Sequence, residues 1–323
     1  MRPAKIFVTH LESSYSGPLQ KAFEWLSLGS AIKHGDSVVI KPNLTFPVFR
    51  PGVMTNPEAI EALIVYLKNY TDNITIAESD SGGYNRFSMD EVFAKTGILE
   101  FAKRYGVRIV NMSYSPSRPI HFRYQFKNFS VPLPTLLLDE TDLFITMPVP
   151  KVHANAGVSL SLKNQWGVIQ EPALRLKLHP YFREVIYQVN KALPKTIVVV
   201  DGKYGLTRNG PMRGDAVELN WVLVGDDPFY VDFVVTEMMG LNPFKIPYLN
   251  YILKKGGISS LEGVQFNQDH RAFIKERFYV SRDWTDLPGV LTFNSRFLAY
   301  VGYESPLAKP LHWLLYFFRE PFY

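Results

Sequence analysis

The amino-acid sequence predicts a doubly wound α/β fold, in which a mostly parallel sheet carries helices on both faces. Two observations favour this fold class. Short runs of β-branched residues alternate with amphipathic segments through the first two thirds of the 323 residues. These runs show little alternation of polar and apolar residues, as expected for parallel strands that are buried on both faces.

The individual elements follow from the same patterns. The expected strands cover 5–9, 37–40, 73–77, 107–110, 142–147 and 196–200. The expected helices cover 18–28, a segment that starts at 57, 89–105, 180–190, 248–255 and 311–318. Asn56 is the expected N-cap of the second helix, and Gly97 interrupts the third. The proline-containing stretch 116–134 and the glycine-rich segment 201–214 are expected to be irregular.

We expect two regions in the chain. Residues 1–242 form the α/β core, and 243–323 form a less regular, aromatic-rich extension that packs on the core or on a partner. Near the end, an apolar helical face is formed by Leu311, Leu314, Leu315 and Phe318. We expect residues 306–323 to dock on the body of the protein or on a second subunit of a homo-oligomer. The alternative is a peripheral, shallow contact with a membrane surface.

Composition excludes several function classes. The chain has no cysteine, so it can hold no disulfide, thiolate nucleophile or iron–sulfur cluster of its own. The net charge is +5, without a concentrated basic stripe, so we expect a positive lining for a small anion and no nucleic-acid binding. The sequence lacks a signal-peptide pattern and an apolar run of about 20 residues, which favours a cytoplasmic location.

Candidate functional residues follow four of the expected strands. In open α/β sheets, ligands bind beyond the carboxyl ends of the strands, so side chains that follow different strands are expected to converge there. The side chains in these positions are Lys41, Asn43, Asp80, Lys151, His153 and Asp201. Each of them could instead have an ordinary role in a loop or a turn.

Two histidines are candidates for proton transfer. Lys151 and His153 are two residues apart, so both point the same way in an extended segment. A nearby lysine lowers the pKa of an imidazole and keeps it neutral, as a base requires. His179 stands at the start of an expected helix, where the cationic form is disfavoured. It is therefore a candidate base or metal ligand, with a plain capping or surface role as the alternative.

Further basic residues lie downstream. Lys163 and Asn164 stand among apolar residues rather than in a charge run, which argues against a solvated surface. Arg208 and Arg213 lie in the glycine-rich segment and could clamp a carboxylate or a phosphate, unless this segment is an ordinary turn. The segment matches neither the P-loop nor the dinucleotide-binding glycine fingerprint, so flavin or nicotinamide chemistry is disfavoured.

Taken together and in this order, the motifs resemble the family called domain of unknown function 362. The resemblance covers about residues 35–240. It is carried by 41–43 (KPN), 55–58 (TNPE), 78–80 (ESD), 148–153 (PVPKVH), 161–167 (SLKNQWG), His179, Asp201 with Gly202, 210–214 (GPMRG) and 225–232 (GDDPFYVD). Many members of that family carry an added cysteine-rich, ferredoxin-like part. Any redox role tied to such clusters is absent from this cysteine-free chain or is supplied by a partner.

More distantly, the layout is similar to the N-terminal part of the nickel-pincer lactate racemases. The matching positions are His153, Lys163 and His179. The resemblance implies a lysine that tethers the pincer cofactor and histidines that ligate nickel or move the substrate proton. The sequence departs from that family at two places. Asp80 lies near where the family has a catalytic histidine, and the glycine pair before the family's lysine is missing.

The favoured interpretation is an enzyme that acts on a small anionic metabolite, a carboxylate or a phosphate. The expected substrate-binding residues are Lys41, Asn43, Lys151, Asn164, Arg208 and Arg213. The expected acid–base residues are His153, His179, Lys163 and Asp80. A divalent metal, if used, would be held by Asp201, His153 and His179. The alternatives are a non-catalytic binding or assembly protein that uses the aromatic C-terminus, and a racemase-like or isomerase-like enzyme.

Overall fold

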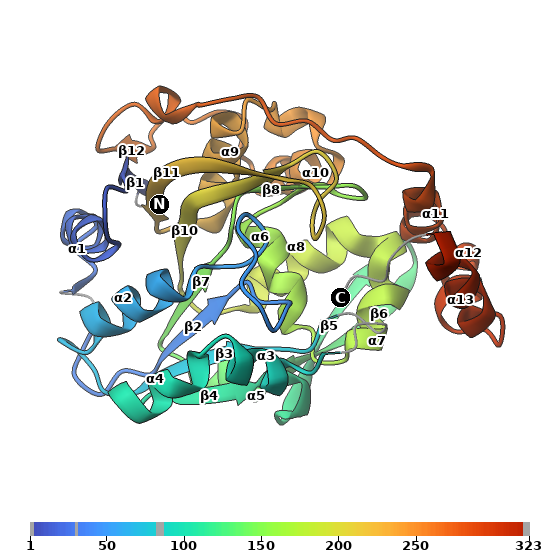
Figure 1. The fold of residues 1–323 in the computed structure, drawn as a ribbon, viewed down its shortest axis with the longest axis horizontal. Coiled ribbons are helices and arrows are strands. Elements are labelled where there is room, and N and C mark those ends of the chain that lie inside the picture. Colours follow the sequence, from blue (N-terminus) through green and yellow to red (C-terminus); the bar gives the residue numbers. More distant parts are fainter. Residues whose placement is uncertain (1–2, 30–31, 82–86, 319–323) are drawn as a thin grey trace.

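The computed structural model describes residues 3–29, 32–81 and 87–318, and it is built around one ten-stranded sheet (Figure 1). The main strands lie in the order β12–β1–β11–β10–β7–β2–β3–β4. Their bounds are β1 (Lys5–His10), β2 (Val38–Pro42), β3 (Ile74–Glu78), β4 (Arg108–Asn111), β7 (Leu143–Met147), β10 (Thr196–Thr207), β11 (Asp215–Gly225) and β12 (Gln265–Phe266). On this path only β11 runs antiparallel to its neighbours. Two short strands, β8 (Lys151–His153) and β9 (Gly157–Ser159), extend the sheet beside β10.

Helices cover both faces of the sheet, which confirms the predicted α/β class. One face packs against α1 (Ser16–Trp25), α2 (Pro57–Leu67), α3 (Met89–Lys95) and α4 (Ile98–Tyr105). The other packs against α5 (Thr135–Asp139), α6 (Ser161–Asn164), α7 (Pro172–Leu178), α8 (Phe182–Ala192), α9 (Pro228–Met238) and α10 (Pro247–Lys255). Successive strand residues alternate between these two cores, so that Val39 faces one and Ile40 the other. Because both faces are buried, the strands carry no polar alternation.

Local signals that fix the predicted helix ends are present in the structure. The side chain of Asn56 accepts a hydrogen bond from the backbone N–H of Glu58 at 3.0 Å, and Pro57 is the first residue of α2. Gly97 adopts a left-handed backbone conformation, with φ of +79°, between α3 and α4. This conformation suits glycine and explains why the predicted helix 89–105 is two helices.

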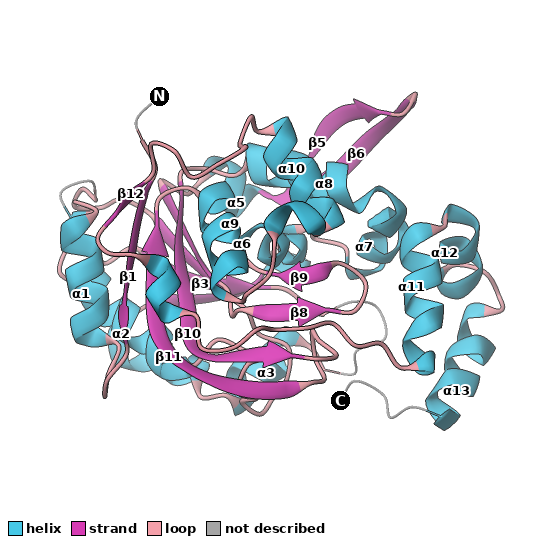
Figure 2. Cartoon of the chain, turned by 90° about the horizontal axis from the view of Figure 1, so that it is seen from above, coloured by secondary structure: helices cyan, strands magenta, loops and turns pink. Residues whose placement is uncertain are grey.

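Two stretches that were expected to be irregular are strands instead. Residues 116–134 contain an antiparallel hairpin of β5 (Ser117–Tyr124) and β6 (Lys127–Pro134), which projects from the body (Figure 2). Pro119 faces Pro132 in its register, and a two-stranded sheet tolerates prolines because each strand has a free edge. In the glycine-rich segment 201–214, β10 continues as far as Thr207 and pairs with β11.

The C-terminal region contributes to the body and also extends beyond it. Two of its elements, α10 and β12, pack on α8 and beside β1, and the division at residue 242 stays a prediction. Farther along, α11 (Leu287–Asn294), α12 (Arg296–Tyr303) and α13 (Ala308–Phe318) lie together at one end of the molecule, beyond α7 (Figure 1). Within the described residues, every helix is too short or too polar to span a lipid bilayer. The cytoplasmic location stays a prediction.

The glycine at position 202 yields a prediction about stability. A Cβ built on Gly202 would overlap the indole ring of Trp221 on the neighbouring strand. We expect Gly202→Ala to lower the free energy of unfolding by about 1–3 kcal/mol, because the ring must shift within a packed core. Urea unfolding measures this effect. The control is Gly17→Ala, where the added methyl meets no atom within 4 Å. Equal stability of the two variants would contradict the prediction.

Candidate functional site

A cavity of about 210 Å³ opens at the carboxyl ends of β2 and β3, next to β8. Seven of the candidate residues from the sequence line it together, although they come from segments far apart in the chain. They are Lys41, Asn43, Lys151, His153, Lys163, Asn164 and His179. Several residues that were not among the candidates also line the cavity, among them Glu78, Ser79, Trp166 and Arg175. The enclosure of so many ionisable groups makes this the candidate functional site.

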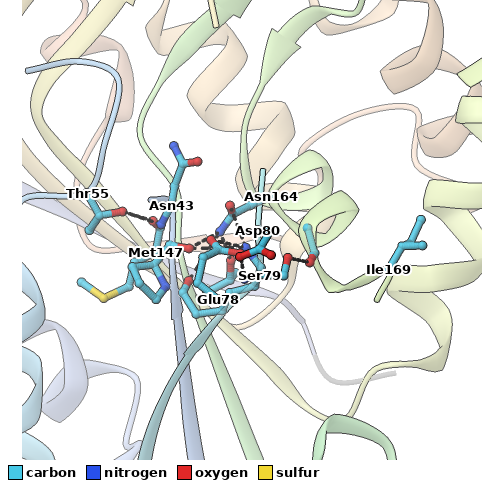
Figure 3. A network of polar contacts seen from close by, with 12 residues as sticks. Asn43, Thr55, Glu78, Ser79, Asp80, Met147, Asn164 and Ile169 are labelled. Atoms are coloured by element: carbon cyan, nitrogen blue, oxygen red, sulfur yellow. Dashed lines mark hydrogen bonds and ion pairs between the residues drawn. The ribbon is translucent and has the colours of Figure 1, made fainter. Parts of the chain in front are cut away.

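An ion pair between two strand ends forms one wall of the cavity. The Nζ atom of Lys41 donates to Glu78 Oε2 at 2.8 Å and to Asn164 Oδ1 at 3.2 Å. The two charged side chains are only 1% and 5% exposed. Burial lowers the pKa of Lys41, and the carboxylate of Glu78 opposes that shift. The backbone N–H of Ser79 also donates to Glu78 at 2.9 Å, so the buried carboxylate is well satisfied (Figure 3).

The sheet and a short helix hold this pair in place. Lys41 lies opposite Thr146 of β7 in the sheet register, and Asn164 Nδ2 donates to the hydroxyl of Thr146 at 2.9 Å. The helix α6 (Ser161–Asn164), which carries Lys163 and Asn164, begins beside Asp232 of α9. The carboxylate of Asp232 accepts the backbone N–H groups at the start of that helix at 2.8 and 3.0 Å. Acceptors at a helix start stabilise it, so Asp232 positions α6 against the strand ends.

Two further lysines put uncompensated positive charge into the cavity. Burial lowers the pKa of Lys151 to about 7, and the charges of Lys163 and Lys41 add to this effect. Its Nζ atom donates to the backbone carbonyl of Val53 at 2.8 Å. Burial and the charge of Lys41 lower the pKa of Lys163 to about 8. Among the described residues, no carboxylate pairs with either amine. Both lysines therefore titrate near neutral pH.

The ring of His153 is held in one tautomer by the backbone. Its Nδ1 atom accepts hydrogen bonds from the N–H groups of Asn155 at 3.1 Å and Ala156 at 3.3 Å. The proton of the neutral ring is therefore on Nε2. Burial, followed by the charge of Lys163, holds the pKa of His153 well below its usual value. This arrangement suits a hydrogen-bond donor, which differs from the base role that the sequence suggested.

The second imidazole, His179, is neutral for a reason other than the one expected. It directly follows α7 and begins the 3₁₀ helix η4 (His179–Tyr181), so it does not face an open helix N-terminus. Its ring stacks on Trp166 at 5.6 Å between centroids, and Phe293 of α11 lies 4.9 Å away. Burial among these rings, together with the charge of Lys163, lowers the pKa of His179 to about 3.

Arg175 is a functional candidate that the sequence analysis missed. Its guanidinium donates to the carbonyls of Ile169 and Asp80, both at 2.7 Å, and to the hydroxyl of Ser79 at 2.6 Å. Burial lowers its pKa to about 10. The available signal was its position on α7, three residues before the buried Leu178, which places a cation on the apolar face of an amphipathic helix.

Other predicted site residues lie outside the cavity lining. The carboxylate of Asp80 accepts from the backbone N–H of Met89 at 2.7 Å and stabilises the start of α3. Asp201 accepts from the hydroxyl of Tyr15 and the N–H of Asn56, both at 2.7 Å. Arg208 pairs with Asp215 at 2.8 Å on an exposed edge. Arg213 also lies outside the lining, although its neighbours Pro211 and Met212 belong to it.

The predicted metal-ligand set is not brought together. Across residues 3–29, 32–81 and 87–318, no three His, Asp or Glu side chains form a group that could hold a metal ion. The imidazoles of His153 and His179 share the cavity with three lysines, whose charge repels a bare divalent cation. The surroundings therefore suit an anion better than a metal ion.

The fold and this cavity define an α/β protein with a cation-rich pocket at the carboxyl ends of its parallel strands. The matching family model is described as "Domain of unknown function (DUF362)", and it covers residues 38–237. The chain belongs to this family, which confirms the resemblance that its motifs predicted.

Similar proteins are known in several bacteria. A thylakoid-associated protein of Synechocystis sp. is 26% identical over 229 residues, which are 68% of each chain. The lactate racemase apoprotein from Thermoanaerobacterium thermosaccharolyticum is a structural neighbour with a TM-score of 0.44 and 16% identity; the match covers 72% of this chain and 57% of that one. A protein from Thermotoga maritima is a second structural neighbour, with a TM-score of 0.38 and 11% identity; the match covers 74% of this chain and 59% of that one. These structural likenesses are distant, so the chemistry of the site rests on its own residues.

The buried ion pair gives a second prediction. We expect Lys41→Met to lower the free energy of unfolding by about 3–5 kcal/mol, because it removes the cation that hydrogen-bonds to the buried carboxylate of Glu78. The double variant Lys41→Met with Glu78→Gln removes that charge and is expected to recover most of the loss. Urea unfolding at pH 7 compares the three proteins. A double variant no more stable than the single one would show that the unpaired charge is not the cause.

Proposed function

We propose that the cavity binds a small anionic metabolite, a phosphate ester or a carboxylate, and that its lysines move a proton on the bound molecule. The observation that carries this proposal is the imbalance of charge. Among the described residues, four cationic side chains, Lys41, Lys151, Lys163 and Arg175, line the cavity with a single carboxylate, Glu78. That carboxylate already pairs with Lys41, so a bound anion would compensate the remaining charge.

The size and donors of the cavity support a compact ligand. A volume of about 210 Å³ is below the roughly 300–1,000 Å³ of sites for drug-sized molecules. The donors available to an anion are the amines of Lys151 and Lys163 and the Nε2–H of His153. Because the ring of His153 is fixed by the backbone, it can donate to an oxygen on which negative charge develops.

The two lysines are suited to proton transfer. A general acid or base works best when its pKa lies near the working pH, and the pKa values of Lys151 and Lys163 are lowered to about 7 and about 8. A neutral amine can take a proton from the ligand while a charged one returns a proton to it. Such a reaction is an isomerisation, and it balances without an oxidant, a reductant or another co-reactant. A positioned acid or base of this kind contributes about 10²–10⁴-fold in rate.

Sulfate is a direct probe of anion binding, since its charge stays constant between pH 6 and 9. Both lysines are charged at the lower end of this range and mostly neutral at the upper end. We therefore expect sulfate to bind at least about tenfold more tightly at pH 6 than at pH 9. We also expect binding near pH 8 to take up protons, measured by isothermal titration calorimetry in buffers of different ionisation enthalpy.

A matched pair of variants assigns this binding to the cavity. Lys163→Met is expected to weaken sulfate binding by about tenfold or more, because it removes a charge-assisted donor. Lys103→Met removes an exposed lysine of α4 and is expected to leave the affinity unchanged. Sulfate affinity that is independent of pH, or equal in both variants, would refute anion binding in the cavity.

Proton transfer has a separate test that does not depend on the identity of the substrate. Small carboxylates and phosphate esters are incubated with the protein in D₂O, and mass spectrometry follows exchange of carbon-bound hydrogen. We expect at least one compound to exchange, with the rate lowered about 10²-fold or more in Lys151→Met. Lys103→Met is again the control. If sulfate binds as expected but no compound exchanges, the proposed proton transfer is wrong while anion binding stands.

A further inference from the structure

The C-terminal helices expose an unusual amount of apolar surface. Most of the exposed large apolar side chains in the described part of the chain lie between residues 284 and 318. Trp313 and Phe317 of α13 are 71% and 77% exposed, and Phe297 of α12 is 72% exposed. Soluble proteins rarely leave so many large apolar groups together on one surface without a partner. We call α11, α12 and α13, with Trp284 before them, the C-terminal module.

The inner side of this module is already occupied by the protein. Phe293 of α11 packs against His179 and against Phe182, with ring centroids 4.9 and 5.2 Å apart. Glu304, just after α12, pairs with Lys177 of α7 at 3.2 Å. The module is therefore fixed to the body through Phe293 and Glu304, while its exposed aromatic side chains are left in contact with solvent. An apolar groove of about 480 Å³ also lies between its own helices.

The charges of the module indicate what kind of surface it fits. Of its acidic groups, Glu304 pairs with Lys177 of the body, and Asp286 is only 4% exposed and accepts from Asn209. In contrast, no carboxylate of the described residues pairs with Lys309 on α13. Among the described groups of the module, the charge that remains available is therefore positive. An apolar face with a cation complements a surface that is both apolar and anionic.

The aromatic composition of the module indicates that the surface it fits is a lipid surface. Tryptophan and tyrosine combine an apolar body with a polar edge and favour the boundary between water and lipid. The module exposes both kinds, in Trp284, Trp313 and Tyr300. A second copy of the chain would present a face with the same positive charge, which disfavours self-association through this face. Since no described helix can span a bilayer, contact would be restricted to its surface.

We propose that the C-terminal module binds the surface of a bilayer that contains anionic lipid. Phe297, Trp313 and Phe317 enter the headgroup region, and Lys309 contacts the lipid charge. This inference is independent of the anion site, because it rests on the outer side of the module and uses no residue of the cavity.

Vesicle flotation of the full chain tests the inference. We expect the protein to float with equimolar phosphatidylcholine and phosphatidylglycerol, and more weakly with phosphatidylcholine alone. The double variant Trp313→Ala with Phe317→Ala is expected to lose at least about tenfold in binding, because two aromatic groups are no longer buried. Lys309→Glu should weaken binding to the mixed vesicles only. Phe126→Ala is the matched control, since Phe126 is 96% exposed but lies at the turn of the β5–β6 hairpin.

Several outcomes would overturn the proposal. They are absence of flotation on both kinds of vesicle, equal flotation of the double variant and the Phe126→Ala control, or unchanged binding of Lys309→Glu to the mixed vesicles. A dimer in solution that becomes monomeric in the double variant, without vesicle binding by the original chain, would assign the face to self-association instead. Urea unfolding of each variant shows whether the chain has remained folded.

Discussion

The buried ion pair between Lys41 and Glu78 is the interaction on which the arrangement of the site depends. It joins the ends of two neighbouring parallel strands, and Asn164 connects it to α6. Removing two charges from water is costly, and this geometry offsets the cost only because Glu78 also accepts a backbone N–H. Because Asn164 is next to Lys163 on α6, these contacts, together with those of Asp232, determine where Lys163 lies. The order of the strands therefore brings the two charged side chains together, and this pair in turn positions α6 and one wall of the cavity.

Around this pair the fold concentrates charges of one sign. Lys151, Lys163 and Arg175 lose hydration on burial, and the two lysines are also repelled by neighbouring cations, so the pKa of each group is lowered. Such an arrangement does not stabilise the folded chain, because all three groups would be better solvated if the chain unfolded. It persists because the surrounding sheet and helices are extensively packed. An anion in the cavity would relieve the repulsion, so the proposed ligand would gain affinity from this electrostatic cost.

The sequence predicted the α/β class and the convergence of side chains at the strand ends, because both follow from strand order and periodicity. The prediction failed for residues whose position depends on the path that the chain takes after a strand. Glu78 still belongs to β3 and faces Lys41, whereas the chain has turned at Asp80, whose carboxylate stabilises α3. Asp201 does not follow a strand end, because β10 continues past it and directs it toward Tyr15. The role of Arg175 depends on its contacts with Ser79 and Asp80, which are distant from it in the sequence.

The C-terminal helices connect the outside of the molecule with the chemistry of the cavity. Phe293 covers the ring of His179, and burial is the main reason that this imidazole is neutral. If α11 moved away, water would reach the ring and its pKa would rise toward the usual value. Below that pH the resulting imidazolium would repel Lys163 and attract an anion more strongly. Displacement of α11 would therefore change the charge of the site, although the module itself supplies no described residue to the cavity lining.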